Sequence, residues 1–268
     1  MEEISRHRDA IDAIDGRLLD LLNERALLAQ KIGLIKERNG RPVYAPERAE
    51  QLMRRLAAQS KGPLGAEAIR AIYREIMSAS LALEKDMLIA CEGCLAGRTH
   101  FAAKQQFGSS VRYAFHPKFP DLFDAVTSGE ADCGVIPFGE EGPESSVLEL
   151  LMAGEIRLTS QIVLSGEEGG FRYLVLGRML NTPSGDDQTA LLFHLTDRTG
   201  AIASTLEPFR AHGVNVISIQ SRQAGTGGLH LFLEVEGHVV DEPLHQALET
   251  LRASGFSPKV CGSYPRAH

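Results

Sequence analysis

The sequence predicts a multidomain protein in which an all-helical N-terminal unit precedes an α/β unit and a C-terminal α+β unit. The first 86 residues have apolar side chains at helical spacing, and the following stretch turns to short β-rich runs separated by helices. The last part alternates strands and helices in a βαββαβ order. A chain of 268 residues is long enough for two or three such units.

The N-terminal unit starts with one long predicted helix, residues 5–38, which contains no proline. Its apolar side chains recur three or four positions apart, at Ile11, Ile14, Leu18, Leu21, Leu28, Ile32 and Ile35. At 1.5 Å per residue this helix would be on the order of 50 Å long, more than one small domain can cover, so a partner helix is expected. Helices 46–59 and 65–84 complete the unit.

Residues 87–180 are expected to form the α/β unit, with strands at 87–91, 110–114, 133–137 and 156–164 and helices at 100–107 and 119–128. A polar linker, 181–187, follows. The C-terminal unit, 187–268, is expected to have strands at 189–195, 214–221, 229–236 and 258–263 and helices at 201–212 and 243–254.

Composition excludes several classes of function. A formal net charge of -7 argues against a nucleic-acid partner. No apolar run is long enough to cross a bilayer and the N-terminus is charged, so we expect a cytoplasmic protein without a membrane partner. Cys91 and Cys94 form a CxxC pair, but no second pair or nearby histidines complete a site, so we expect neither metal nor cofactor.

Charged side chains stand where the helical pattern calls for apolar ones. Arg25 occupies a position of the apolar seam of the first helix, and Lys36 lies three turns later on nearly the same face. On the third helix Ser80 and Glu84 follow a face of isoleucines. Arg25 alone could pair with a neighbouring acid or reach water, but with Arg48 these residues indicate a pocket for a small polyanion.

Residues 11–36 (IDAIDGRLLDLLNERALLAQKIGLIK) and 41–48 (RPVYAPER) carry a family resemblance, as do residues 73–85 (YREIMSASLALEK). They are similar to the helical, AroQ-type mutase of the bifunctional chorismate mutase/prephenate dehydratase family. Residues 196–223 and 259–267 resemble the ACT regulatory domain of that family. The resemblance implies an intertwined mutase dimer for 1–86, a periplasmic-binding-like dehydratase region for 87–180 and a ferredoxin-like ACT domain for 187–268.

The resemblance also implies the roles of the mutase residues. Arg25, Lys36, Arg48 and Glu84 would line one site, with Ser80 at its edge, and Arg8 would reach in from the partner subunit. The implied reaction converts chorismate to prephenate, a Claisen rearrangement of a dianion that positioning and electrostatics can accelerate without a cofactor.

In the implied mechanism, Arg8 and Arg25 clamp the two carboxylates of the substrate, and Arg48 lies close by as a support for the ring carboxylate or the ring hydroxyl. Lys36 and a protonated Glu84 donate hydrogen bonds to the ether oxygen as negative charge grows on it.

The chain departs from the family at several positions. Ala49 stands where the family has a glutamate, so a mutase or lyase acting on a related chorismate derivative is an alternative. Gly139-Glu140-Glu141 replaces a Glu-Asn-Ser stretch of the dehydratase, and Phe171 replaces its catalytic threonine. The family's dehydratase has a second lobe at a point where this chain has only residues 161–170. We therefore expect dehydratase activity to be lost, and the alternative is that the chain is a bifunctional mutase and dehydratase.

The C-terminal resemblance implies an effector site for an aromatic amino acid, with phenylalanine as the first choice. Its residues would be Thr199, Gly200, Ala201, Ile202, Gln220, Ser221 and Arg222. Two of the four residues of the family's ESRP motif differ here, so a unit that only dimerises is an alternative. A further alternative is a non-catalytic amino-acid sensor that regulates a partner enzyme.

Overall fold

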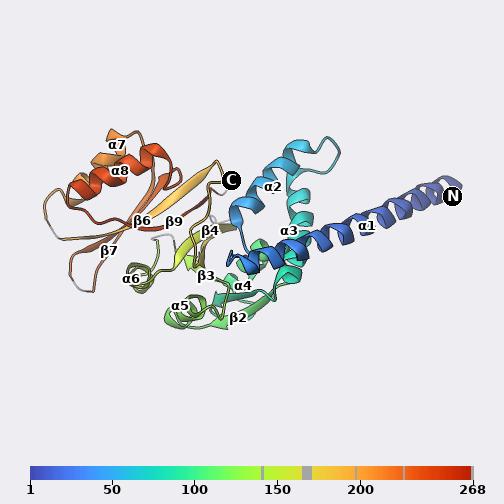
Figure 1. The fold of residues 1–268 in the computed structure, drawn as a ribbon, viewed down its shortest axis with the longest axis horizontal. Helices are drawn as coiled ribbons and strands as arrows, with labels where there is room; N and C mark the ends of the chain where they lie inside the picture. The colour runs from blue at the N-terminus through green and yellow to red at the C-terminus, as the bar shows by residue number, and fades with distance from the viewer. Residues whose placement is uncertain (140–141, 165–170, 197, 226, 267–268) are drawn as a thin grey trace.

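The computed structural model describes residues 1–139, 142–164, 171–196, 198–225 and 227–266. Three helices come first, namely α1 (Glu2–Arg38), α2 (Pro46–Gln59) and α3 (Ala66–Glu84). The N-terminal half of α1 extends away from the rest of the chain (Figure 1). The seven side chains of its apolar seam are each between 49% and 59% exposed, so this chain does not cover them. A partner helix therefore remains expected.

The middle of the chain forms one five-stranded sheet, with strand order β2-β1-β3-β5-β4. Strand β1 runs parallel to β2 and β3, whereas β5 is antiparallel to β3 and β4. The elements are β1 (Leu88–Glu92), α4 (Arg98–Phe107), β2 (Arg112–His116), α5 (Phe119–Ser128), β3 (Cys133–Phe138), α6 (Ser145–Ala153), β4 (Arg157–Leu164) and β5 (Phe171–Gly177). The sequence did not predict α6, because nine residues are too few for a clear periodicity.

The C-terminal sheet has the order β7-β8-β6-β9 and is antiparallel. Its elements are β6 (Asp187–Leu195), α7 (Ala201–Ala211), β7 (Val216–Gln223), β8 (Leu229–Glu236), α8 (Glu242–Ala253) and β9 (Lys259–Pro265). The predicted βαββαβ order is confirmed. Helices α7 and α8 cover one face of the sheet, where Leu191, Phe193, Leu231 and Leu233 are buried with Phe209 and Leu248.

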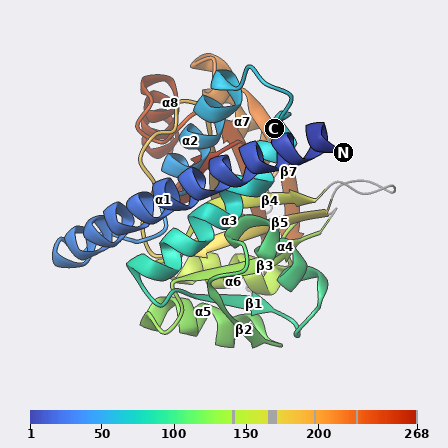
Figure 2. The same ribbon diagram turned by 90° about the vertical axis from the view of Figure 1, so that its right-hand side faces the viewer.

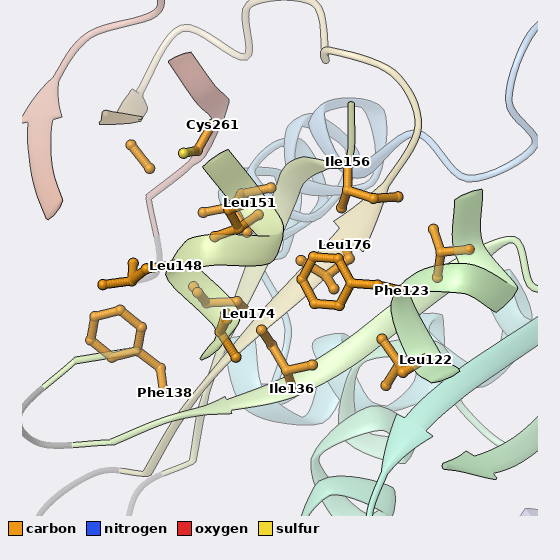
Figure 3. Packing of buried hydrophobic residues seen from close by; sticks show 14 of the residues in the cluster. Leu122, Phe123, Ile136, Phe138, Leu148, Leu151, Ile156, Leu174, Leu176 and Cys261 are labelled. Carbon is orange, nitrogen blue, oxygen red and sulfur yellow. The ribbon is translucent and has the colours of Figure 1, made fainter. Parts of the chain in front are cut away.

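The other face of the C-terminal sheet shares a core with the middle sheet. Ala190, Leu192, Phe232 and Tyr264 of the C-terminal sheet pack in one cluster with Leu148, Leu151, Leu174 and Leu176. Figure 3 shows Cys261 of β9 at this cluster. At Gly262 an added Cβ would lie 2.0 Å from the carbonyl oxygen of Leu158, so β9 approaches β4 at a distance that a larger residue would prevent.

The predicted linker, 181–187, is fixed in place. Asn181 donates from Nδ2 to the carbonyl oxygens of Thr159 in β4 (2.7 Å) and Ser263 in β9 (2.9 Å), one from each sheet. Ser184 and Asp187 are buried. In the view of Figure 2, α1 crosses in front of the body formed by the two sheets. Among the described residues, no helix combines the length and apolar character needed to span a membrane.

Candidate functional site

A cavity of about 960 Å³ lies between the three N-terminal helices, the middle sheet and the end of β9. All five residues predicted for this chain's own share of the mutase site line it, namely Arg25, Lys36, Arg48, Ser80 and Glu84. Helix α4, strand β4 and Arg266 also contribute to its wall. The cavity is therefore built by all three parts of the chain.

Lys36 lies at the joint between α1 and α3. Its Nζ donates to Oε2 of Glu84 at 2.8 Å, and the side chains are 23% and 9% exposed. The same Nζ donates to the carbonyl oxygen of Val43 at 2.8 Å. Oε2 of Glu84 thus accepts a hydrogen bond from Lys36, and the donor role expected for a protonated Glu84 toward the substrate stays a prediction.

Arg25 and Ser80 form the second polar pair of the cavity. Arg25 donates from Nη1 to Oγ of Ser80, and Ser80 donates in turn to the carbonyl oxygen of Ile76 at 2.8 Å. Ser80 is 7% exposed, so the hydroxyl holds the guanidinium at the wall of the cavity.

A glycine explains why α1 and α3 come together here. A Cβ added at Gly33 would lie 2.9 Å from Cα and 3.0 Å from the carbonyl oxygen of Glu84. Backbone atoms cannot yield as a flexible side chain can, so this position has to be glycine for Glu84 to reach Lys36. A glycine inside a helical pattern was the sequence signal for this contact, and we did not use it.

Arg8 lies apart from these residues. It is exposed on the free N-terminal half of α1, and the seventeen helical steps from it to Arg25 correspond to about 25 Å of helix. Arg8 can enter such a site only in a second copy of the chain.

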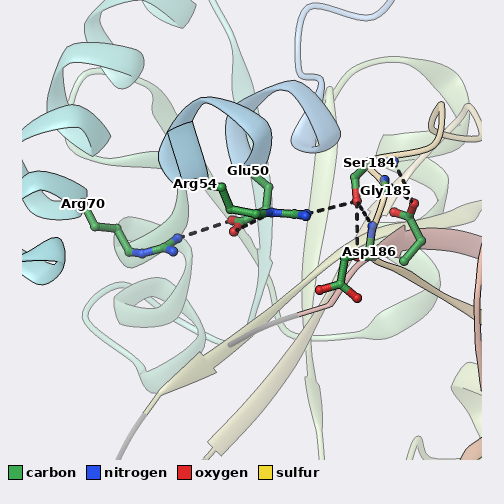
Figure 4. A network of polar contacts seen from close by, with 7 residues as sticks. Glu50, Arg54, Arg70, Ser184, Gly185 and Asp186 are labelled. Carbon is green, nitrogen blue, oxygen red and sulfur yellow. Dashed lines mark hydrogen bonds and ion pairs between the residues drawn. The ribbon is translucent and has the colours of Figure 1, made fainter. Parts of the chain in front are cut away.

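The side of α2 that faces the cavity is largely apolar. Ala45, Ala49, Leu52 and Met53 line the cavity beside Arg48. Glu50 also reaches the wall, but its carboxylate lies 3.6 Å from Nε of Arg54 and 3.4 Å from Nη1 of Arg70 (Figure 4). Glu50 is therefore paired with Arg54 and Arg70 where it reaches the cavity.

The linker lies along the opposite face of α2. Oγ1 of Thr182 donates to Glu47 at 3.2 Å, Nε2 of Gln51 donates to the carbonyl oxygen of Pro183 at 3.5 Å, and Nη2 of Arg54 donates to Oγ of Ser184 at 3.2 Å. Figure 4 shows Arg54 between Glu50 and Ser184. The three α2 positions are spaced by about one turn, so the linker contacts the helix that carries Arg48.

A second cavity, of about 290 Å³, lies at the start of α7. Of the predicted effector residues, Gly200, Ala201 and Ile202 line it. Thr199 is exposed next to it, and Ser221 is exposed on edge strand β7. The sequence analysis did not predict the other lining residues, Leu195, Thr196, Arg198, Ala203, Gln223, Gly228 and Leu229.

Gln220 and Arg222 lie on the other face of the C-terminal sheet, paired with Phe232 and His230. The side chain of Gln220 reaches Gly142 of the middle unit, where an added Cβ would lie 2.7 Å from its Oε1. Successive side chains of a strand point to opposite faces of the sheet, so Gln220 and Arg222 lie on one face and Ser221 and Gln223 on the other. The predicted effector residues therefore do not line one cavity of this chain.

The segment that resembles the dehydratase motif contributes a buried ion pair. Phe171 is 46% exposed at the start of β5, and Arg98 lies over its ring at 4.7 Å. The next residue, Arg172, forms a two-point ion pair with Glu234 of β8, with a distance of 2.6 Å between Nη1 and Oε2. Glu140 and Glu141 lie outside the described residues.

Glu234 also accepts hydrogen bonds from Tyr264 (2.6 Å), Ser218 (2.7 Å) and Gln188 (3.0 Å). Burial alone would raise the pKa of Glu234, but the hydrogen bonds and the charge of Arg172 outweigh it, so the pKa lies below its usual value. The pair therefore joins the middle and C-terminal units in its charged form.

The cysteines and acidic groups give no second site in the part of the chain that is described. Cys91 is buried in β1 and Cys94 is exposed, and both are free thiols. Burial raises the pKa of the Cys91 thiol to about 12. No group of three or more His, Cys, Asp or Glu side chains among the described residues could hold a metal ion.

Two segments of the chain match known protein families. Residues 7–85 match the family described as chorismate mutase type II, and residues 189–253 match the ACT domain. The chain is also 29% identical to a bifunctional chorismate mutase/prephenate dehydratase of Aquifex aeolicus, over 100% of this chain and 99% of the relative. That alignment runs over 358 positions, more than 268 residues can fill, so parts of the relative have no counterpart here.

Solved structures resemble the middle and C-terminal parts. A prephenate dehydratase from Streptococcus mutans has a TM-score of 0.59 at 25% identity and covers 67% of this chain and 100% of its own. A prephenate dehydratase from Arthrobacter aurescens, in complex with L-Phe, has a TM-score of 0.60 at 17% identity and covers 68% of this chain and 90% of its own. The second likeness shows the fold alone.

Proposed function

We propose that this chain, in which residues 7–85 match the chorismate mutase type II family and residues 189–253 match the ACT domain, converts chorismate to prephenate in aromatic amino acid biosynthesis. One observation carries the proposal. Arg25, Lys36, Arg48, Ser80 and Glu84, from three different helices, line a single cavity. The three cations among them suit a dianion that reacts without a covalent intermediate. We assign the domains to residues 1–86, 87–180 and 187–268.

The proposed site binds the substrate by its charges. Arg25, braced by Ser80, holds one carboxylate, and Arg8 of a second copy of the chain holds the other. Lys36 donates to the ether oxygen, where negative charge grows as the bond breaks. The exposed seam of α1 supports the second copy, because apolar side chains spaced along a helix favour pairing with another helix.

We further propose that dehydratase activity is lost. Phe171 brings no hydroxyl to the position of the family's catalytic threonine, and Arg172 is engaged by Glu234. The structure has one middle sheet, in which β4 and β5 pair directly and residues 165–170 alone separate them in the chain. The middle unit then serves as a connection between the other two.

Regulation by an aromatic amino acid, with phenylalanine as the first candidate, completes the proposal. The cavity at Gly200, Ala201 and Ile202 supports an effector site, which a second copy would have to complete. The linker contacts from Thr182 and Ser184 to α2 support a route from the C-terminal unit to Arg48.

The decisive experiment follows chorismate with the purified full-length chain and detects prephenate and phenylpyruvate separately. Each assay is repeated with phenylalanine, tyrosine or tryptophan. Prephenate without phenylpyruvate is the expected result, and at least one amino acid should change the rate. Phenylpyruvate would contradict the loss of dehydratase activity. No turnover of chorismate would favour either a related substrate or a sensor that does not catalyse. The structural reason to consider a related substrate is that Ala45 and Ala49 make the cavity apolar beside Arg48.

Replacing Gly33 by alanine tests the approach of α1 to α3. The added methyl group has to push the backbone of Glu84 away, so we expect kcat for chorismate to fall roughly 10-fold or more, because small displacements of catalytic groups are costly. Steady-state kinetics measures the change. Lys31→Ala, an exposed position on the same helix, is the control and should keep the wild-type kcat. A Gly33→Ala variant with wild-type kcat would show that the close contact is dispensable.

A further inference from the structure

The loop between α1 and α2, residues 39–45, makes two hydrogen bonds with Lys36. The backbone N–H of Arg41 donates to the carbonyl oxygen of Lys36 at 2.9 Å, and Nζ of Lys36 donates to the carbonyl oxygen of Val43 at 2.8 Å. A lysine ammonium has three N–H donors. Val43 and Glu84 use two of them, so their positions decide where the third donor points.

The residue after Val43 is anchored in the middle unit. The ring of Tyr44 lies 4.8 Å from that of Phe107 at 55°, and its hydroxyl accepts a hydrogen bond of 2.8 Å from Nε2 of Gln106. Phe107 and Gln106 belong to α4. Tyr44 thereby packs against the buried cluster on one side of the middle sheet, which includes Ile89 and Val135.

The same unit also holds α3, which carries Glu84. The backbone N–H of Ser110 donates to Oγ of Ser78 at 2.9 Å, and that of Ser109 donates to Oε2 of Glu75 at 3.0 Å. Ser78 is 1% exposed. Contacts with the middle unit therefore position both partners of Lys36. Val43 is held through Tyr44, and Glu84 is held through the hydrogen bonds that Ser109 and Ser110 make with α3.

We propose that Tyr44 is a positioning residue for Lys36, and that the middle unit supports the mutase cavity through it. This inference rests on the proposed function. Without the ring of Tyr44 the loop can move away from α4 and take the carbonyl of Val43 with it. Lys36 then loses one of its two fixed partners, and its remaining N–H no longer points in one direction. A displacement of this kind lowers the rate rather than substrate binding.

The test compares Tyr44→Ala with Phe115→Ala in the full-length chain. Phe115 packs against the same buried cluster, with its ring 5.0 Å from that of His100, but it adjoins neither the loop nor Ser109 and Ser110. Both variants should lower the melting temperature. Tyr44→Ala alone should lower kcat, by on the order of 10-fold, with a smaller change in KM. Tyr44→Phe keeps the ring and should retain most of the wild-type kcat.

A double variant gives the second readout. If Tyr44 acts through Lys36, then Tyr44→Ala in a Lys36→Ala background should cause no further loss of kcat, whereas independent roles would give multiplied losses. Where an alanine variant does not fold, Tyr44→Leu and Phe115→Leu replace the pair.

Multiplied losses, an unchanged kcat in Tyr44→Ala, or an equal loss in Phe115→Ala would each overturn the role of Tyr44 while leaving the function of the wild type intact. An inactive wild type would instead contradict the proposed function, and with it this role.

Discussion

Lys36→Ala is expected to lower kcat for chorismate by roughly 10²- to 10³-fold, the usual cost of losing one donor to a developing negative charge. Lys36 is well placed for this effect, because Glu84 and Val43 hold its Nζ at 2.8 Å each and fix its direction. An interaction made chiefly in the transition state lowers kcat and kcat/KM together. Steady-state kinetics with chorismate measures both quantities.

Two comparisons sharpen this result. Lys31→Ala removes an exposed lysine from the same helix and should change kcat by less than about twofold, as surface substitutions usually do. Glu84→Gln keeps Lys36 but replaces the carboxylate that accepts its hydrogen bond. Comparing this variant with Lys36→Ala separates the effect of losing the Lys36 donor from the effect of losing its position. A folded Lys36→Ala protein that turns over chorismate at the wild-type rate would remove Lys36 from the mechanism.

Glu234→Gln is expected to destabilise the chain by about 3 kcal/mol at neutral pH, because removing one partner of a buried ion pair leaves the other uncompensated. Glu234 is 0% exposed and holds Arg172, Tyr264 and Ser218. The amide of glutamine has one acceptor oxygen where the carboxylate has two, and its NH₂ group would face the donor groups of these residues. Urea unfolding monitored by circular dichroism measures the change in the free energy of unfolding.

Acid should weaken this interaction in the wild type. The pKa of Glu234 is lower in the folded chain than its usual value of 4.5, so the unfolded chain takes up the proton first as the pH falls. The stabilisation is therefore complete above about pH 4.5 and is lost as the pH falls through the folded-state pKa. The urea midpoint of the wild type should fall more than that of Glu234→Gln between pH 7 and pH 3.5.

Glu249→Gln is the matched control for this pair. Glu249 pairs with Arg252 on α8, but both side chains are about half exposed, at 58% and 47%. Exposed pairs contribute about 1 kcal/mol or less. A Glu234→Gln variant no less stable than Glu249→Gln would mean that the buried pair does not join the two units.

The sequence by itself predicted most of the elements, but neither α6 nor β5, and four of the residues that line the cavity. Helical spacing placed Arg25 and Lys36 on one face of α1, because side chains three and four residues apart share a face whatever surrounds the helix. The same rule placed Ser80 and Glu84 together on α3. The unusual position of charge among apolar residues then singled them out, and this signal is local to each helix.

Only the tertiary structure decided how the parts meet. Nothing local to Tyr44 indicates that its ring enters another unit, and nothing local to Arg172 indicates that Glu234 lies opposite it. The composition of residues 181–187 predicted only a polar linker, yet its side chains contact α2 and the two sheets. Such contacts join residues distant in the chain, so they depend on the packing of whole sheets and helices, which no periodicity within one element records.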